Sequence, residues 1–224
     1  MATGRDCRPA RGSPGGVYAR VVPEHDEVRL YGPWRQRTPQ QAKQLLDDYP
    51  GRWWIAGGWA IEAFTARPRP HADLDLGIPR TDVALLVDHL AGCIDVWAAD
   101  HGALRPLPPP APPVPDTCTN LWLRAGGAYP WEYDVLLSDV DDQGRTYRPA
   151  PGVALPVEQA LWTRDGVAYL APQVQLLHKA HATRAKDHED LQACLPLLTP
   201  NAREWLRVSL DVAYPDHRWR EHLT

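Results

Sequence analysis

The sequence predicts an α+β fold, in which a mixed β-sheet domain flanked by helices is followed by a mostly helical C-terminal portion. Up to about residue 150, short apolar runs bounded by turn residues alternate with segments of helical periodicity. From Pro156 onwards the helical pattern dominates. A chain of 224 residues is long enough for one large domain with a helical appendage. We therefore predict a sheet domain at residues 28–150 and a mostly helical portion at residues 151–224.

Turn residues and caps mark where the individual elements begin and end. Thr38 is expected to cap a helix whose first residue is Pro39, and Pro172 opens another helix. The proline-rich stretch 105–115 can form neither a helix nor a central strand, which leaves an ordered loop, a flexible lid or an SH3-type ligand. The predicted strands are 53–56, 74–78, 94–98, 119–124, 131–137 and 167–170, and the predicted helices are 40–49, 58–66, 82–90, 157–162, 172–181, 187–195 and 202–213.

Composition excludes several classes of protein. The net charge of −4 gives no global basic field of the kind that marks general nucleic-acid binders, so any RNA would need a local basic patch. The four cysteines are scattered and form no CxxC pair, which argues against a structural zinc site and favours reduced, buried thiols. Residues 1–27, rich in Gly, Pro and Arg, predict a disordered N-terminal extension without a signal peptide. We therefore expect a cytoplasmic protein.

The most informative segment is 53–78, WWIAGGWAIEAFTARPRPHADLDLGI. It predicts a short strand, a turn at Gly57 and Gly58, a helix, a basic loop and a second strand with Asp73 and Asp75. Aspartates at i and i+2 of a strand point to the same face, and two such carboxylates usually share a cation. A double-glycine turn lets a polyphosphate approach the backbone and a helix N-terminus. Together these features predict nucleotidyl transfer.

A third carboxylate on a neighbouring strand would complete a two-metal site. Asp134, in WEYDVLL, is the best candidate, because an unpaired carboxylate inside an apolar strand is costly to bury. One Mg²⁺ bound by Asp73 and Asp75 would bind the triphosphate, and a second, shared with Asp134, would lower the pKa of the attacking hydroxyl. Asp134 could also be the general base, and Glu132 is a fallback ligand.

Structural explanations compete with these roles. Asp73 and Asp75 could form salt bridges with Arg67 and Arg69, and the glycine turn could serve packing alone. Asp134 could be a surface residue of an edge strand. These alternatives remain open at the level of the sequence.

The quoted motifs carry a family resemblance. The pattern GGWAIE…RPRPHADLDL resembles the nucleotidyltransferase superfamily typified by DNA polymerase beta, and within it the aminoglycoside 2''-O-nucleotidyltransferase and lincosamide nucleotidyltransferase branch. The later run YLAPQVQLLHKAHATRAKDHEDL is similar to the helical half of that family. Glu62 stands where the branch usually has Asp, and Trp59 stands where the wider superfamily has a serine. The resemblance implies a nucleotidyltransferase catalytic domain at residues 28–150, with the helical portion completing the site.

The resemblance also implies roles for individual residues. Asp73, Asp75 and Asp134 would be the catalytic metal ligands. The residues implied in nucleotide binding are Gly57, Gly58, Arg69, His71 and Lys179, with Arg184 or Lys186 as helpers.

The implied function is Mg²⁺-dependent transfer of AMP from ATP to a hydroxyl of a small molecule, with an aminoglycoside-type antibiotic as one candidate acceptor. A polycationic acceptor needs an acidic surface, for which the sequence offers Asp139, Asp141, Asp142 and Glu158. One alternative is a toxin-like nucleotidyltransferase acting on tRNA or a protein through basic residues such as Arg67. Another is a non-catalytic nucleotide-binding protein.

Overall fold

A single extended β-sheet organises the molecule. The computed structural model describes residues 30–141 and 144–223, which form a ten-stranded mixed sheet in the order β4-β3-β5-β6-β2-β1-β10-β9, with β7 paired to β6 and β8 to β7. The strands are β1 (Trp54–Ile55), β2 (Asp75–Pro79), β3 (Asp95–Asp100), β4 (Ala103–Pro106), β5 (Asn120–Arg124), β6 (Tyr133–Asp141), β7 (Gly144–Thr146), β8 (Ala154–Leu155), β9 (Leu161–Arg164) and β10 (Val167–Leu170). The mixed sheet and the helices around it confirm the predicted α+β class.

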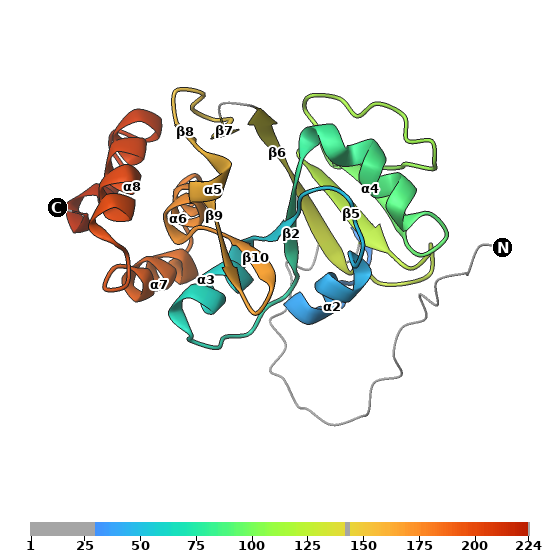
Figure 1. Ribbon diagram of the computed structural model, residues 1–224, viewed down its shortest axis with the longest axis horizontal. Helices are drawn as coiled ribbons and strands as arrows, with labels where there is room; N and C mark the ends of the chain where they lie inside the picture. Colours follow the sequence, from blue (N-terminus) through green and yellow to red (C-terminus); the bar gives the residue numbers. More distant parts are fainter. Residues whose placement is uncertain (1–29, 142–143, 224) are drawn as a thin grey trace.

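Helices flank the sheet, and those of the C-terminal part gather at one end of the molecule. They are α2 (Pro39–Leu45), α3 (Gly57–Thr65), α4 (Val83–Leu90), α5 (Val157–Ala160), α6 (Pro172–Ala180), α7 (Ala185–Cys194) and α8 (Pro200–Ala213), with 3-10 turns η1 (Arg80–Asp82) and η2 (Arg218–His222). In Figure 1, α6, α7 and α8 lie together at one end of the molecule, near α3, whereas α4 lies at the other end. Thr38 caps α2 in a reciprocal capping box with Gln41, so the predicted start of this helix is confirmed.

One face of the sheet packs against α2 and α4. The buried apolar residues of this core include Leu46, Leu86 and Leu90 from the helical side and Leu76, Ile78, Leu121, Leu123, Val135 and Leu137 from the strands. Because side chains alternate along a strand, the positions between these residues point to the opposite face. That face therefore presents Asp75, Asn120, Trp122 and Asp134.

The C-terminal helices form a second core with α3. Ile61 of α3 packs with Leu176, Leu191, Leu206 and Trp219, so this core links the sheet to the end of the chain. Trp219 is fully buried, and its indole N–H donates a hydrogen bond to His188 at 2.8 Å. The last turn of the chain is thus part of the folded core.

The helix predicted at residues 157–162 is shorter than expected. α5 ends at Ala160, and the chain then forms β9, which pairs with β10 through a turn at Asp165 and Gly166. Both turn residues have positive φ, 52° and 71°, which suits a tight hairpin. β10 in turn pairs in parallel with β1. The sheet therefore continues beyond residue 150, and the division into two parts at that position remains a prediction.

Three further expectations concern the termini, membranes and thiols. The disordered extension predicted at residues 1–27 lies outside the described residues. None of the described helices has the length and apolar character needed to cross a bilayer. Cys118 and Cys194 are buried free thiols, but Cys93 is disulfide-bonded, so the expectation of reduced thiols is wrong for Cys93.

We expect Trp219→Ala to lower the free energy of unfolding by about 3–5 kcal/mol, because it leaves a large cavity in the second core. Urea unfolding followed by circular dichroism measures this loss. The matched control is Val212→Ala, since the Val212 side chain is 57% exposed on α8 and should change stability by less than about 0.5 kcal/mol. A loss below about 1 kcal/mol for Trp219→Ala would show that η2 does not belong to the core.

Candidate active site

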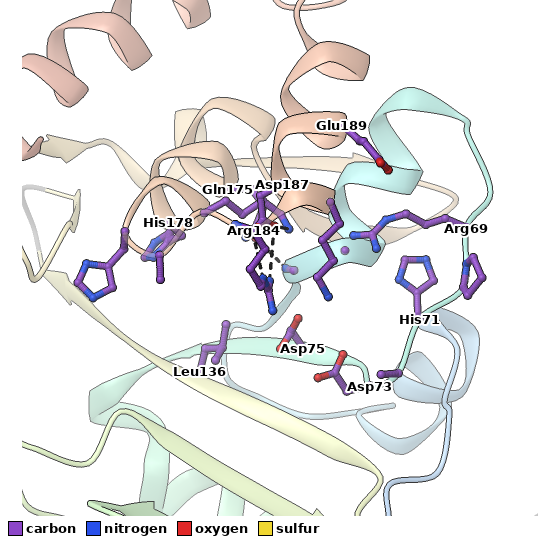
Figure 2. A pocket seen from close by; sticks show the side chains of 18 residues that line it. Arg69, His71, Asp73, Asp75, Leu136, Gln175, His178, Arg184, Asp187 and Glu189 are labelled. Atoms are coloured by element: carbon purple, nitrogen blue, oxygen red, sulfur yellow. Dashed lines mark hydrogen bonds and ion pairs between the residues drawn. The ribbon is translucent and has the colours of Figure 1, made fainter. Parts of the chain in front are cut away.

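The candidate active site lies where β2 pairs in parallel with β6. The strand register sets Asp75, the first residue of β2, directly opposite Asp134 of β6. Asp73 lies two residues before Asp75. Figure 2 shows both aspartates on one wall of a cleft of about 570 Å³, with their carboxylates directed into it. The structure thus places all three predicted carboxylates in one neighbourhood.

The carboxylates have unusual electrostatics. Burial and the neighbouring Asp73 carboxylate raise the pKa of Asp75 to about 7, and the positive charges that oppose this shift are those of Lys179, Lys186 and Arg184. The Asp75 side chain is nevertheless partly exposed, because it opens into the cleft. Burial, followed by repulsion from Asp75, raises the pKa of Asp134 well above its usual range. Burial and the closeness of other carboxylates therefore both raise the pKa values of Asp75 and Asp134.

The amide of Asn120 supports Asp134. Its nitrogen donates to both carboxylate oxygens, at 2.8 and 3.0 Å. Asn120 lies on β5, where its Cα is paired with that of Leu136 on β6. This contact orients the Asp134 carboxylate within the sheet.

The chemistry of this donor set fits a hard divalent cation. Hard cations prefer carboxylate oxygens and relieve the repulsion between neighbouring carboxylates. Arg69, one of the salt-bridge partners considered for Asp73 and Asp75, pairs instead with Asp190 at 3.2 Å. Within residues 30–141 and 144–223, however, no three His, Cys, Asp or Glu side chains are grouped to hold one metal ion. The three-carboxylate metal site therefore remains a prediction.

The glycine turn is required by close packing at Gly57. A β-carbon at Gly57 would lie 1.6 Å from Oδ2 of Asp75, and its φ of +61° suits glycine. The Gly57 N–H donates to Oε1 of Gln175 at 2.7 Å, which ties the first residue of α3 to α6. Gly58 is less crowded, since a β-carbon there would lie 2.5 Å from the guanidinium of Arg69, which can move. Gly57 and Gly58 thus line the cleft with backbone at the start of α3, close to the side chains of Asp75, Arg69 and His71.

The basic loop after α3 is held by Glu62. Its carboxylate accepts the backbone N–H of Arg69 at 3.0 Å and lies 2.8 Å from Nε2 of His71. The His71 ring stacks on Trp59, with ring centroids 4.1 Å apart. Burial lowers the pKa of His71, and the Glu62 carboxylate partly offsets this effect. Figure 2 shows Arg69 and His71 at one end of the cleft.

Most basic residues of the helical half are already paired. Nζ of Lys179 lies 2.7 Å from Asp187 and 2.9 Å from Asp190, and the ammonium is almost fully buried. Arg184 forms a capping contact with Asp187 at 3.0 Å. Lys186 also lines the cleft, and in the part of the chain that the structure describes it forms no ion pair. Lys179 thus lines the cleft, but its charge is held by two carboxylates.

The end of the cleft away from His71 contains His178 (Figure 2). Arg145 donates to Nε2 of His178 at 2.7 Å, which assigns the ring proton of the neutral imidazole to Nδ1. Burial and the Arg145 charge lower the pKa of His178 to about 3. Arg145 is itself buried and also donates to Ser138 at 3.3 Å. His178 is therefore a neutral side chain at neutral pH.

Three residues of this site were absent from the sequence prediction: Asn120, Gln175 and His178. A signal existed for two of them. Asn120 is a polar residue at the start of an apolar strand, and Gln175 interrupts the buried face of α6. Neither position specifies a partner, because the contacts join distant segments of the chain.

Two candidates from the sequence are committed to other contacts. Glu132 is buried and binds Arg37 at 2.6 Å, so its carboxylate is engaged in an ion pair, and its role as a fallback metal ligand stays a prediction. Asp139 binds Arg80 at 3.3 Å and Arg148 at 2.7 Å. These arginines lower the pKa of Asp139 despite the opposing effect of partial burial. Asp139 is therefore not a free acidic group.

Comparison with protein families gives one match. Residues 40–100 match the model of the aminoglycoside-2''-adenylyltransferase family. This segment contains α3, β2 and the residues Gly57, Gly58, Asp73 and Asp75. It does not reach Asp134 or the helical half. A search of curated protein sequences finds no significant match.

Solved structures show similarity in fold. The antibiotic-resistance factor ANT(2'')-Ia, studied in solution, has a TM-score of 0.50 and 18% identity, covering 83% of this chain and 95% of that chain. The lincosamide antibiotic adenylyltransferase LnuA, bound to lincomycin, has a TM-score of 0.47 and 16% identity, covering 69% and 92%. The Megavirus polyadenylate synthase has a TM-score of 0.43 and 13% identity, covering 83% and 40%.

The matched segment contains the Gly-Gly turn and the Asp-x-Asp pattern, and the fold resembles that of ANT(2'')-Ia. Over residues 40–100 the chain resembles the aminoglycoside-2''-adenylyltransferases, and its fold is similar to that of ANT(2'')-Ia.

Proposed function

We propose that the protein is a Mg²⁺-dependent enzyme that transfers AMP from ATP to a hydroxyl group of a small molecule. The observation that supports this proposal most directly is the pair Asp75 and Asp134 on neighbouring strands, with Asp73 beside them and the backbone of Gly57 in contact with Asp75. A buried group of carboxylates next to an exposed helix N-terminus suits a metal-bound triphosphate. A cytoplasmic location remains a prediction.

The nucleotide would bind between the start of α3 and the basic residues around the cleft. The N-terminus of α3 has a partial positive charge and exposes backbone next to Gly58. His71 at one end of the cleft and Lys186 across it supply hydrogen-bonding or cationic groups toward phosphates, whereas Arg69 would have to leave Asp190 before it could bind one. The ammonium of Lys179 is held by Asp187 and Asp190, so it would contact a phosphate directly only if these ion pairs opened on binding.

Asp73, Asp75 and Asp134 would hold Mg²⁺, which would neutralise charge on the triphosphate and lower the pKa of the acceptor hydroxyl. Asp134 would accept the proton of that hydroxyl. The amide of Asn120 keeps this carboxylate oriented. The hydroxyl oxygen then forms a bond to the α-phosphorus while the bond to the β-phosphate oxygen breaks. Pyrophosphate leaves and AMP remains on the acceptor.

The tRNA alternative lacks support in the cleft. Arg69 and Arg184, two basic residues that line the cleft, form ion pairs with Asp190 and Asp187. A backbone-binding groove needs basic side chains that are free to pair with phosphates. The small-molecule acceptor is therefore the leading proposal, with an aminoglycoside-type antibiotic as one candidate.

We expect radiolabelled AMP to pass from α-labelled ATP to a hydroxyl compound in the presence of Mg²⁺, with pyrophosphate released in equal amount. A panel of aminoglycosides, lincosamides and bulk tRNA, separated by chromatography, measures this transfer. EDTA should stop it, because the carboxylates cannot bind the triphosphate alone. Label on tRNA alone would contradict the small-molecule proposal.

We expect Asp73→Asn to lower kcat by at least about 100-fold, since even groups that only support metal ligands contribute 10–100-fold. The melting temperature should stay close to that of the unchanged protein, because Asp73 forms no ion pair among the described residues. Glu189→Gln removes another carboxylate of the same cleft and should retain activity. Full activity of Asp73→Asn would leave only a non-catalytic role for this site.

We expect Gly57→Ala to abolish the rise in melting temperature that Mg²⁺ and ATP cause in the unchanged protein. The added methyl group would collide with Asp75 and force the backbone out of a conformation with positive φ. Differential scanning fluorimetry with and without Mg²⁺-ATP measures both stability and binding. Gly152→Ala is the matched control, because a β-carbon at Gly152 meets no atom within 4 Å. If Mg²⁺-ATP raised the melting temperature of Gly57→Ala as much as that of the unchanged protein, the turn at Gly57 would not take part in nucleotide binding.

A further inference from the structure

A row of side chains crosses the sheet face that holds the candidate active site. Asp75 is paired with Asp134, and Asp134 is paired with Trp122 on β5. Trp122 is paired in turn with Trp97 on β3. Directly opposite residues share a face and have β-carbons about 5 Å apart. Trp122 is therefore the neighbour of Asp134 on the side away from Asp75.

Trp122 is held in place by other aromatic residues. Its ring centroid lies 5.6 Å from that of Tyr31, 5.1 Å from that of Trp34 and 5.3 Å from that of Trp131, all in edge-to-face orientations. The Trp131 indole donates to the backbone oxygen of Tyr31 at 2.7 Å. Trp131 is fully buried, but Trp122 remains partly exposed. A rigid, partly exposed indole next to Asp134 offers a flat apolar surface to a bound molecule.

The charges around this surface are positive or compensated. Arg124 lies over the rings of Trp97 and Trp131, at 4.5 and 4.2 Å, and it forms no ion pair within the described residues. The carboxylate of Glu132 is neutralised by Arg37 at 2.6 Å, with a further arginine at 3.4 Å. A cation approaching Trp122 therefore meets an arginine rather than a free carboxylate.

The nearby acidic residues do not change this balance. Asp95 lies on the same face and is exposed, but Arg124 is the residue opposite it in the sheet register, although no ion pair joins them. Asp139, which the sequence suggested for binding a polycation, is occupied by Arg80 and Arg148. Recognition of a polycation needs complementary unpaired carboxylates. Among the described residues on this side of the site, a single exposed carboxylate opposite Arg124 does not make the acidic surface that a polycation needs.

We propose that the acceptor is a hydroxyl compound with an aromatic or apolar ring face and at most one positive charge, and that Trp122 binds this face while the hydroxyl faces Asp134. This inference rests on the proposed function, because it assumes that the acceptor hydroxyl reacts beside Asp134. It refines the acceptor class and disfavours a polycationic aminoglycoside.

Equilibrium binding tests the acceptor class independently of turnover. Isothermal titration of the Mg²⁺-ATP-analogue complex would compare 4-nitrophenyl glucoside, methyl glucoside and tobramycin at two salt concentrations. We expect the aryl glucoside to bind at least about 10-fold more tightly than the methyl glucoside, because only the former has a ring to stack. Its affinity should be insensitive to salt. Equal affinities for the two glucosides, or tightest binding of tobramycin, would overturn the inference.

Trp122 variants test the residue itself. Trp122→Ala should remove the preference for the aryl glucoside and leave ATP binding unchanged, whereas Trp122→Phe should retain most of the preference. Trp162→Ala is the control, because Trp162 packs against Phe64 and Tyr169 instead of this cluster. A purely structural role would alter the melting temperature and ATP affinity of Trp122→Ala while preserving the aryl preference, and that result would also overturn the assignment.

The same reagents separate this inference from the proposed function. AMP transfer to tobramycin with higher kcat/KM than to aryl glycosides would support nucleotidyl transfer and refute the acceptor class. A binding preference for the aryl glucoside that depends on Trp122, with no AMP transfer to any hydroxyl, would support the acceptor surface and refute the proposed function.

Discussion

The parallel pairing of β2 with β6 is the constraint on which the site depends. It sets Asp75 opposite Asp134 and leaves Asp73 next to them. Burial raises the pKa of both carboxylates, and charge repulsion adds to it, from Asp73 at Asp75 and from Asp75 at Asp134. The strand register allows no relief by sliding, because a shift of one residue would turn every core side chain to the wrong face. The charge of these carboxylates must therefore be offset by neighbouring groups or by a bound cation.

Close packing at Gly57 links the sheet to the helical half of the chain. Its α-carbon approaches Asp75 so closely that any side chain would collide, and its N–H is bound by Gln175 of α6. The cleft is thus built by two segments that lie on opposite sides of the predicted boundary at residue 150. β9 and β10 extend the same sheet from the C-terminal side. The helices after residue 170 are therefore part of the architecture of the site.

Most of the positive charge along the cleft is neutralised by carboxylates of α7. Asp187 and Asp190 together hold Lys179, Arg184 and Arg69. A bound polyphosphate would compete with these carboxylates for the same cations, which makes the α7 region the part of the site most responsive to an anionic ligand. By contrast, the face beyond Asp134 consists of packed aromatic rings and Arg124. The two sides of the Asp75 and Asp134 pair thus differ in their chemical character.

The sequence by itself determined the features that depend on near neighbours in the chain. These are the cap at Thr38, most of the strands and helices, the glycine turn, and the common direction of Asp73 and Asp75. A period of two or 3.6 residues and local turn chemistry are sufficient for such predictions. The hairpin at Asp165 was missed because its strand is short and follows a helical pattern without a break.

Only the tertiary structure decided which groups meet. The contacts of Asp75 with Gly57, of Asp134 with Asn120, and of Lys179 with Asp187 and Asp190 depend on how the elements pack. The same is true of the position of Trp122 beside Asp134. A local pattern states that a residue is buried or faces a given side, but it does not state its partner. Strand order and helix docking supply the partner, because they are set by the burial of the whole apolar surface.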